Sequence, residues 1–330
     1  MSLEIRPVSV GCIKADERRI RLRSLRRRMV LSALGAVAVT AVLGFVLAGR
    51  RGQFTAALHS APISLLGLAV LLQVIALLAR TEAWNVCVRA AGGTVTRRLL
   101  FRAAGIGYLA SLVNGSVGVV VRIASLRRLA PQDAPAVPAL VAAEVPIITV
   151  EVALAAIFSF TVIAPLGVPW WVPLIAVGAV VGAVAALRRV SECHRTGLWA
   201  GLAIMRTQGR GRMIAFALLA VCAQVVRNWL MLHAIGVNVS VFDAMALLIA
   251  MFTVGQLPIG PSIGPAAAIL ILGRHGVAAT AAAGVLLTVT SVTGTLCYAA
   301  WSITDRVVTG RVNPTPDAAV ASLAVTPTSA

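Results

Sequence analysis

The sequence predicts an all-α protein that crosses a membrane several times, and three observations support this prediction. Of its 330 residues, 59% are apolar and only 12% are charged, whereas soluble domains carry about a quarter charged residues. Long apolar stretches alternate with short polar segments along most of the chain. The 29 basic residues, all of them arginine except Lys14, gather mainly in these polar segments. We therefore expect a polytopic membrane helical bundle.

Eight apolar stretches are candidates for segments inside the membrane. A helix needs about 20 apolar residues to cross a hydrocarbon core about 30 Å thick. The candidate stretches are 29–48, 61–79, 103–121, 136–164, 168–187, 213–235, 244–272 and 277–301. The first of them is long enough for a full span, which favours an uncleaved helix over a signal peptide.

The distribution of arginine predicts how the chain is oriented. Loops that remain in the cytoplasm carry an excess of basic residues. Segments 1–28, 80–102 and 188–212 are rich in arginine, whereas 165–172 and 236–243 contain none. This pattern predicts a multi-pass protein with a cytoplasmic N-terminus, and the arginine- and alanine-rich composition favours a bacterial inner membrane.

Two of the eight stretches are interrupted near their middle by helix-breaking residues. Broken backbone at membrane depth leaves polar groups unpaired unless protein or a polar cavity surrounds them. If both stretches enter the membrane and turn back, the arginine-rich segments fall on the cytoplasmic side. The interrupting residues are Asn114, Gly115 and Gly118 in the first stretch, and Pro258, Gly260, Pro261 and Gly264 in the second. We predict six spans plus two re-entrant helical hairpins, in two pseudo-repeat halves.

The ends of the chain differ in composition from the apolar part. Residues 1–28 form a basic arm that we place in the cytoplasm, and 29–305 form the transmembrane domain. The tail 306–330 is rich in Pro, Thr, Ala and Ser, which predicts a disordered cytoplasmic segment. Trp84 and Trp301 lie near predicted cytoplasmic ends of spans and are typical of interfacial anchors.

Charged residues inside the apolar stretches are the candidate site. A charge at mid-membrane costs about 2.5–3.5 kcal/mol on insertion scales, so a partner is expected. Glu144 and Glu151 are seven residues apart and share a helix face. Arg227 either forms a structural ion pair with one of them or helps to line a groove for an anionic head group. Arg122 either binds a phosphate or serves only as one of the basic residues that keep a loop in the cytoplasm.

Three short motifs resemble those of a known family. The first runs from Gly115 to Arg122 before a basic pair, the second from Leu257 to Gly264, and the third is Ala143–Glu144. Around them, over most of 30–305, the chain resembles the flippase-like membrane domain family, which is fused to soluble synthases in lysylphosphatidylglycerol synthases and also occurs alone. The resemblance implies a translocator of lipids or lipid-linked molecules. The chain departs from the family at four positions. Asn114 stands where the family has proline, Val119 where it has an acidic residue, Val145 where it has arginine, and Ala268 or a neighbour where it has glutamate.

We therefore predict a lipid translocator that binds an anionic head group in a polar cavity between the two hairpins. The predicted substrate-binding residues are Arg122, Glu144, Glu151, Arg227 and Asn114. The missing family charges leave a second interpretation open, a non-transporting scaffold or accessory subunit for an envelope lipid- or glycan-synthesis enzyme. The predicted partners are the membrane and anionic phospholipids or a lipid-linked substrate, and a synthesis enzyme or a second copy of the chain stays open.

Other classes of function lack their signatures in this sequence. Only eleven acidic residues occur, without a metal-binding cluster, and P-loop, HExxH and serine-nucleophile motifs are missing. The five cysteines have no CxxC spacing. The net charge of +18 comes without an aromatic stacking platform for nucleic acid. We predict no enzyme, no cofactor, no metal and no nucleic-acid partner.

Overall fold

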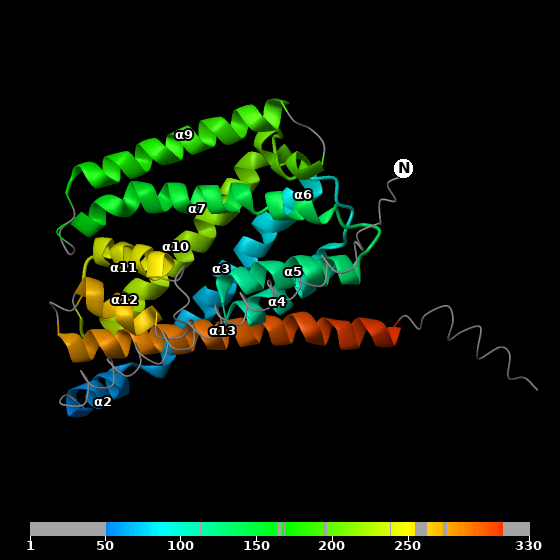
Figure 1. Ribbon diagram of the computed structural model, residues 1–330. Coiled ribbons are helices and arrows are strands. Elements are labelled where there is room, and N and C mark those ends of the chain that lie inside the picture. The colour runs from blue at the N-terminus through cyan, green and yellow to red at the C-terminus, as the bar shows by residue number, and fades with distance from the viewer. Residues whose placement is uncertain are drawn as a thin grey trace, which may run out of the picture.

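The computed structural model describes residues 51–312, except 113, 164–166, 168, 194–196, 238, 255–262 and 273–275. All regular secondary structure in this part is helical, as predicted (Figure 1). The helices are α2 (Arg51–Ser60), α3 (Ile63–Ala90), α4 (Arg97–Ser111), α5 (Gly115–Leu129), α6 (Val137–Ala142), α7 (Val145–Phe158), η1 (Ser159–Val162), α9 (Trp171–Cys193), η2 (Gly197–Arg206), α10 (Arg210–Ala234), α11 (Val241–Val254), α12 (Ile263–Leu272) and α13 (Val277–Val312). The predicted arm 1–28, the predicted first span 29–48 and the end of the tail lie outside the described residues.

Five helical runs in the described part are long and apolar enough to cross a membrane. They are Ile63–Ala90, Val137–Thr161, Trp171–Cys193, Arg210–Ala234 and Val277–Ser302. Each coincides with one of the predicted spans. The helical membrane bundle is therefore confirmed.

The two interrupted stretches form pairs of short helices. Helices α4 and α5 pack against each other, and α11 contacts α12. The pair α4–α5 opens at the end of the bundle where α3 ends, and α11–α12 opens at the opposite end, where α13 begins (Figure 1). We call the first end the arginine-rich end; it carries Arg89, Arg97, Arg98, Arg127, Arg128, Arg188, Arg189, Arg210 and Arg212.

The order of elements repeats in the two halves of the bundle. In the first half, α3 leads into the α4–α5 hairpin and then into α6 and α7; in the second, α10 leads into α11–α12 and then α13. Helices α3 and α10 pack extensively against each other and run in opposite directions (Figure 1). The halves are thus inverted relative to each other, an arrangement that recurs in membrane transporters.

Helix α3 is longer than the sequence indicated. It continues beyond residue 79 to Ala90, so 80–90 are the last turns of a helix, and only 91–96 connect α3 with α4. The charges of this segment do not end the helix because its side chains find partners inside the protein. The first hairpin is also longer than 103–121, since its arms cover 97–129, and α13 continues past residue 305.

Apolar packing holds the hairpins to the long helices. One cluster of buried residues joins α10, α11, α12 and α13, with Leu232, Leu247 and Leu287 at its centre. A second joins α3, α4, α5 and α7 around Trp84 and Leu126. Helix α9 lies along α7 on the outside of the bundle and exposes most of its apolar side chains, as a helix in contact with acyl chains does (Figure 1).

The glycines of the first hairpin have different roles. A Cβ added at Gly118 would lie 2.6 Å from the Ser111 Cβ and 2.9 Å from the Gly107 carbonyl oxygen, so glycine lets α5 approach α4. Gly115 has no positive φ, and a Cβ there would meet no atom within 4 Å. The turn therefore does not require glycine at 115. Of the second set, Pro258, Gly260 and Pro261 lie outside the described residues, and Gly264 is in the first turn of α12.

Candidate functional site

Helix α3 carries the polar groups around which the interior of the bundle is organised. Its side chains Gln73, Thr81, Glu82 and Asn85 are buried, and Arg80 is half-buried. Burying a polar group costs free energy unless it is hydrogen-bonded, and burying a charge costs more. The partners of these side chains therefore show which polar groups of the interior are already hydrogen-bonded and which of them can bind a ligand.

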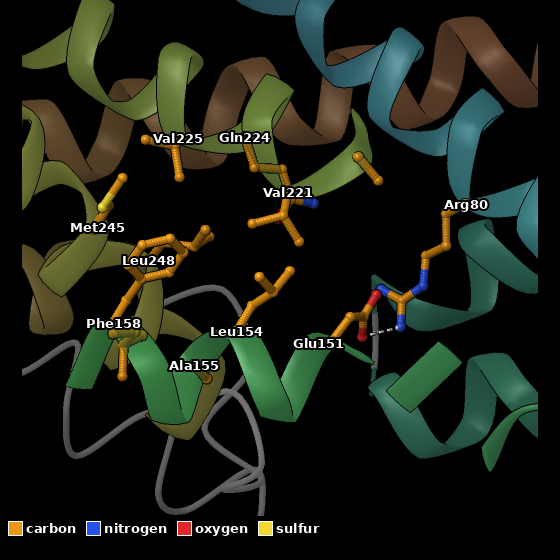
Figure 2. A pocket seen from close by; sticks show the side chains of 12 residues that line it. Arg80, Glu151, Leu154, Ala155, Phe158, Val221, Gln224, Val225, Met245 and Leu248 are labelled. Carbon is orange, nitrogen blue, oxygen red and sulfur yellow. Dashed lines mark hydrogen bonds and ion pairs between the residues drawn. The ribbon is translucent and has the colours of Figure 1, made fainter. Parts of the chain in front are cut away.

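A cavity of about 80 Å³ lies between α3, α7, α10 and α11. At one end, Arg80 Nη2 donates to Glu151 Oε2 over 2.9 Å, and Figure 2 shows the two side chains pointing toward each other. The Arg80 side chain is 35% exposed and that of Glu151 12%. The polar lining residues are Arg80, Glu151 and Gln224, and the apolar ones include Leu154, Phe158, Val221, Met245 and Leu248. The cavity thus offers a charged end and an apolar body to an amphipathic ligand.

A second ion pair, Arg122–Glu144, is fully enclosed. Both side chains are almost completely buried, and the Arg122 guanidinium lies 4.4 Å from the centre of the Trp84 ring. Trp84 is buried itself, so the prediction that it is an interfacial anchor is wrong. With a carboxylate on one side and an indole ring on the other, Arg122 joins α5 to α3 and to the start of α7. Neither Arg122 nor Glu144 lines the cavity.

The two ion pairs follow each other along α7, one at its N-terminal end and the other about two turns further on. Arg80 and Trp84 are four residues apart on α3, and Glu144 and Glu151 are seven apart on α7, so each set shares a helix face. Helices α3 and α7 run in opposite directions (Figure 1). Trp84 is therefore nearer the arginine-rich end than Arg80, and Glu144 is nearer it than Glu151. The predicted common face of the two glutamates therefore holds two separate pairs.

Arg227 has a different environment from the other buried arginines. Its side chain is buried and donates hydrogen bonds to Gln73 Oε1 and, over 3.4 Å, to Asn228 Oδ1. The prediction that Arg227 pairs with Glu144 or Glu151 is wrong, because other arginines occupy both carboxylates. Its partners in the described part of the chain are two neutral amides. Gln73 is held by α13, which approaches it closely at Gly294.

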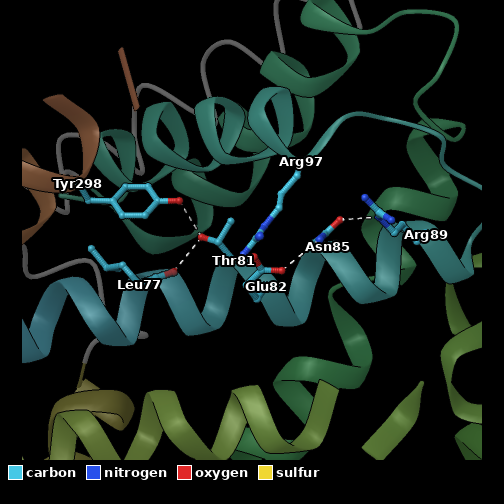
Figure 3. A network of polar contacts seen from close by, with 7 residues as sticks. All are labelled: Leu77, Thr81, Glu82, Asn85, Arg89, Arg97 and Tyr298. Atoms are coloured by element: carbon cyan, nitrogen blue, oxygen red, sulfur yellow. Dashed lines mark hydrogen bonds and ion pairs between the residues drawn. The ribbon is translucent and has the colours of Figure 1, made fainter. Parts of the chain in front are cut away.

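A further polar network lies where α3 approaches the arginine-rich end. Glu82 forms an ion pair with Arg97 of α4 and accepts a hydrogen bond of 3.1 Å from Asn85 Nδ2, and Arg89 Nε donates to Asn85 Oδ1 over 3.1 Å. Figure 3 shows this chain of contacts beside Thr81, whose hydroxyl is 3.0 Å from the Tyr298 hydroxyl of α13. The network ties both halves of the bundle together near one end.

The sequence prediction missed several of these residues. Arg80, Glu82 and Asn85 were assigned to a loop because the segment is charged, and Gln73 was not singled out. One signal favoured the longer helix: between Gly67 and the Gly92-Gly93 pair the sequence contains neither glycine nor proline. A helix that continues to Ala90 brings Arg80, Glu82 and Asn85 to the other helices of the bundle, as it already does Gln73.

The remaining predicted site residues lie apart from the cavity. Asn114 is partly exposed at the turn between α4 and α5, where its carbonyl oxygen accepts a hydrogen bond of 3.1 Å from the Gly118 amide. Of the predicted substrate-binding residues, only Glu151 lines the cavity. The cavity touches α11 of the second hairpin but no residue of α4 or α5. Within the described residues, no group of three or more His, Cys, Asp or Glu side chains is arranged to hold a metal ion.

Comparisons with known proteins found no match for this chain. No family model, no curated protein and no solved structure matches the chain significantly. A functional assignment therefore starts from the bundle, its cavities and its buried charges.

Proposed function

We propose that the protein binds a lipid or lipid-linked molecule within the bundle and moves it between the leaflets of a bacterial inner membrane. The observation that supports this proposal best is the amphipathic cavity between α3, α7, α10 and α11, where the two inverted halves meet. The resemblance of the glycine-centred motifs to flippase-like proteins leads to the same function. The arginine-rich end is placed in the cytoplasm because basic loops are retained there.

The charged end of the cavity suits an anionic head group. A guanidinium offers two parallel donors that match a phosphate or carboxylate, and its charge persists at all physiological pH values. Arg80 is half-buried, and one hydrogen bond pairs it with Glu151. An incoming phosphate can therefore take the place of Glu151 on Arg80, while Gln224, which also lines the cavity, offers an amide.

The apolar part of the cavity suits the remainder of such a molecule. Leucine, valine, methionine and phenylalanine side chains from α7, α10 and α11 line it. At about 80 Å³ the cavity holds about two or three water molecules. A lipid head group is larger, so its entry requires α7 and α11 to separate. The two hairpins, re-entrant from opposite leaflets in this proposal, shorten the path that a head group must cross.

Leaflet exchange in reconstituted liposomes tests the proposal. Labelled phosphatidylglycerol or a labelled polyprenyl phosphate is followed from one leaflet to the other in liposomes with and without the protein. We expect exchange above the protein-free rate, and a reduction of about tenfold for Arg80→Gln, because a charge-assisted hydrogen bond contributes about 1.5–3 kcal/mol. Arg188→Gln, which removes the exposed partner of Glu192, is the matched control and should leave the rate unchanged.

One observation favours a second candidate, a scaffold for an envelope-synthesis enzyme. Arg122 and Glu144 pair with each other inside the protein, whereas several arginines are exposed at one end, where an acidic protein surface can dock. The same liposomes separate the two candidates. Exchange no faster than in protein-free liposomes, for every anionic and polyprenyl lipid tried, would refute translocation and leave the scaffold.

A further inference from the structure

A second cavity lies at the arginine-rich end, outside the proposed translocation site. Its volume is about 510 Å³, within the usual range for small-molecule sites. It is lined by Leu78 of α3, by Arg97, Arg98, Phe101 and Arg102 of α4, and by Trp301 and Ser302 of α13. It shares no lining residue with the cavity at Arg80.

The charge of this cavity is strongly positive. Three of the seven lining residues are arginines and none is acidic. Glu82 lies behind the lining and pairs with Arg97. The Arg98 side chain is exposed and makes no hydrogen bond or ion pair with the described part of the chain. Its guanidinium is therefore available to an anion, and it presents the paired donors that phosphate oxygens accept.

Aromatic residues favour a position of this cavity at the level of lipid head groups. Trp301 is 54% exposed, and its ring packs edge-on against Phe101 with centroids 5.9 Å apart. The Arg97 guanidinium lies 5.4 Å from the centre of the Phe101 ring. Tryptophan concentrates where a membrane meets water, because one part of its ring system is apolar and its N–H is polar. Basic and aromatic residues side by side at this depth match the phosphate and glycerol regions of a phospholipid.

The position of the cavity gives a bound head group a structural role. It lies between α4, the first arm of the first hairpin, and α13, the last helix of the second half. The two helices pack closely at its edge, where Gly105 of α4 meets Ser302 of α13. A ligand that bridges Arg98 and Trp301 therefore ties one half of the bundle to the other.

We propose that this cavity binds the phosphate of an anionic phospholipid head group from the cytoplasmic leaflet, with Arg97, Arg98 and Arg102 around the phosphate and Trp301 beside the glycerol. Phosphate chemistry alone is shared with soluble phosphate esters. The exposed tryptophan and Leu78 favour a ligand that carries acyl chains. This inference does not depend on translocation, since a head group held here stabilises the bundle whether or not a lipid crosses it.

Ligand-dependent thermal protection of the full-length protein tests the inference. The purified protein in neutral detergent is titrated with dioctanoyl phosphatidylglycerol, with dioctanoyl phosphatidylcholine and with inorganic phosphate. We expect phosphatidylglycerol to raise the unfolding temperature at far lower concentration than the other two. Arg98→Gln should weaken the phosphatidylglycerol effect about tenfold, since it removes charge-assisted hydrogen bonds.

Arg212→Gln is the matched control for this substitution. Arg212 is also an exposed arginine near the arginine-rich end and also lies over an aromatic ring, 5.5 Å from the centre of Phe216, but it lines neither cavity. Equal loss of phosphatidylglycerol protection in Arg98→Gln and Arg212→Gln would overturn the site. Protection by inorganic phosphate at the same concentration as phosphatidylglycerol would overturn the lipid as its ligand.

Fluorescence quenching gives a second measurement that needs no arginine variant. Phosphatidylglycerol brominated on acyl-chain carbons near the glycerol should quench the tryptophan fluorescence of the protein more than phosphatidylcholine brominated at the same carbons does. The difference should disappear in Trp301→Phe, because none of the other tryptophans lines this cavity. An unchanged difference in Trp301→Phe also contradicts the proposal.

Discussion

Arg122 and Arg227 are buried to the same extent, each with 4% of its surface exposed, yet their surroundings differ in kind. Arg122 faces the Glu144 carboxylate and the Trp84 ring. Arg227 faces the amides of Gln73 and Asn228. A carboxylate therefore compensates the positive charge of Arg122, whereas the positive charge of Arg227 is surrounded by neutral partners.

This difference shows what hydrogen bonds alone can do for a buried charge. An amide oxygen satisfies a guanidinium N–H, but it does not offset the loss of hydration of a full positive charge. A carboxylate does both when the geometry is good. Loss of Glu144 should therefore lower the free energy of unfolding more than loss of Gln73, although both residues bond a buried arginine.

The largest effect is expected for Glu144→Gln. The substitution keeps the shape of the side chain but leaves Arg122 buried without a counter-charge, a change that costs about 3–5 kcal/mol in comparable buried pairs. The free energy of unfolding in lipid nanodiscs, measured by denaturant titration, checks it. The double variant Arg122→Met, Glu144→Met should be much closer to the wild type, because it removes both charges together. A single variant as stable as the wild type would show that Arg122 does not need the carboxylate.

A smaller effect is expected for Gln73→Leu. It removes one hydrogen bond to a charged group, which is worth about 1.5–3 kcal/mol, while the charge of Arg227 is as poorly compensated as before. Adding Arg227→Met to this variant should recover most of the loss in unfolding free energy. If Gln73→Leu destabilises the protein more than Glu144→Gln, the contrast between the two arginines is wrong.

The sequence predicted the helical class and most spans, because apolar stretches of the right length leave few alternatives. It also predicted two hairpins from residues such as Asn114 and Gly260, which interrupt otherwise apolar segments. The first hairpin is present as two packed helices. Gly118, one of the interrupting residues, serves the packing between its arms.

The partners of the buried charges were not predictable in the same way. The sequence places Glu151 and Arg227 at membrane depth, but periodicity does not say which helices become neighbours. The charged turns of α3 from Arg80 to Arg89 were the decisive omission. Polarity suggested a loop, whereas tertiary contacts from α4 and α7 satisfy those charges and keep the segment helical. Local sequence carries little information about such contacts.

The last prediction concerns the glycines that let a neighbouring helix reach each arginine centre. At Gly107 an added Cβ would lie 2.6 Å from the Arg122 Cβ and 3.0 Å from the Gly118 carbonyl oxygen, so the facing backbone must shift. At Gly294 it would lie 2.6 Å from the Gln73 Cγ and 2.8 Å from the Gln73 Cβ, whereas the nearest backbone atom, the Val70 carbonyl oxygen, is 3.3 Å away. We expect Gly107→Ala to destabilise the protein by about 1–3 kcal/mol, as overpacking does, and Gly294→Ala to cost less.

Gly115→Ala is the control for both glycine substitutions. A Cβ at Gly115 meets no atom within 4 Å, and alanine is the better helix former, so this variant should be as stable as the wild type or slightly more stable. Unfolding free energies of the three variants, measured side by side in nanodiscs, decide the order. A larger cost for Gly294→Ala than for Gly107→Ala would mean that the Gln73–Arg227 contact is the more rigid of the two. The neutral amides would then hold their arginine more tightly than the carboxylate and the indole ring hold theirs.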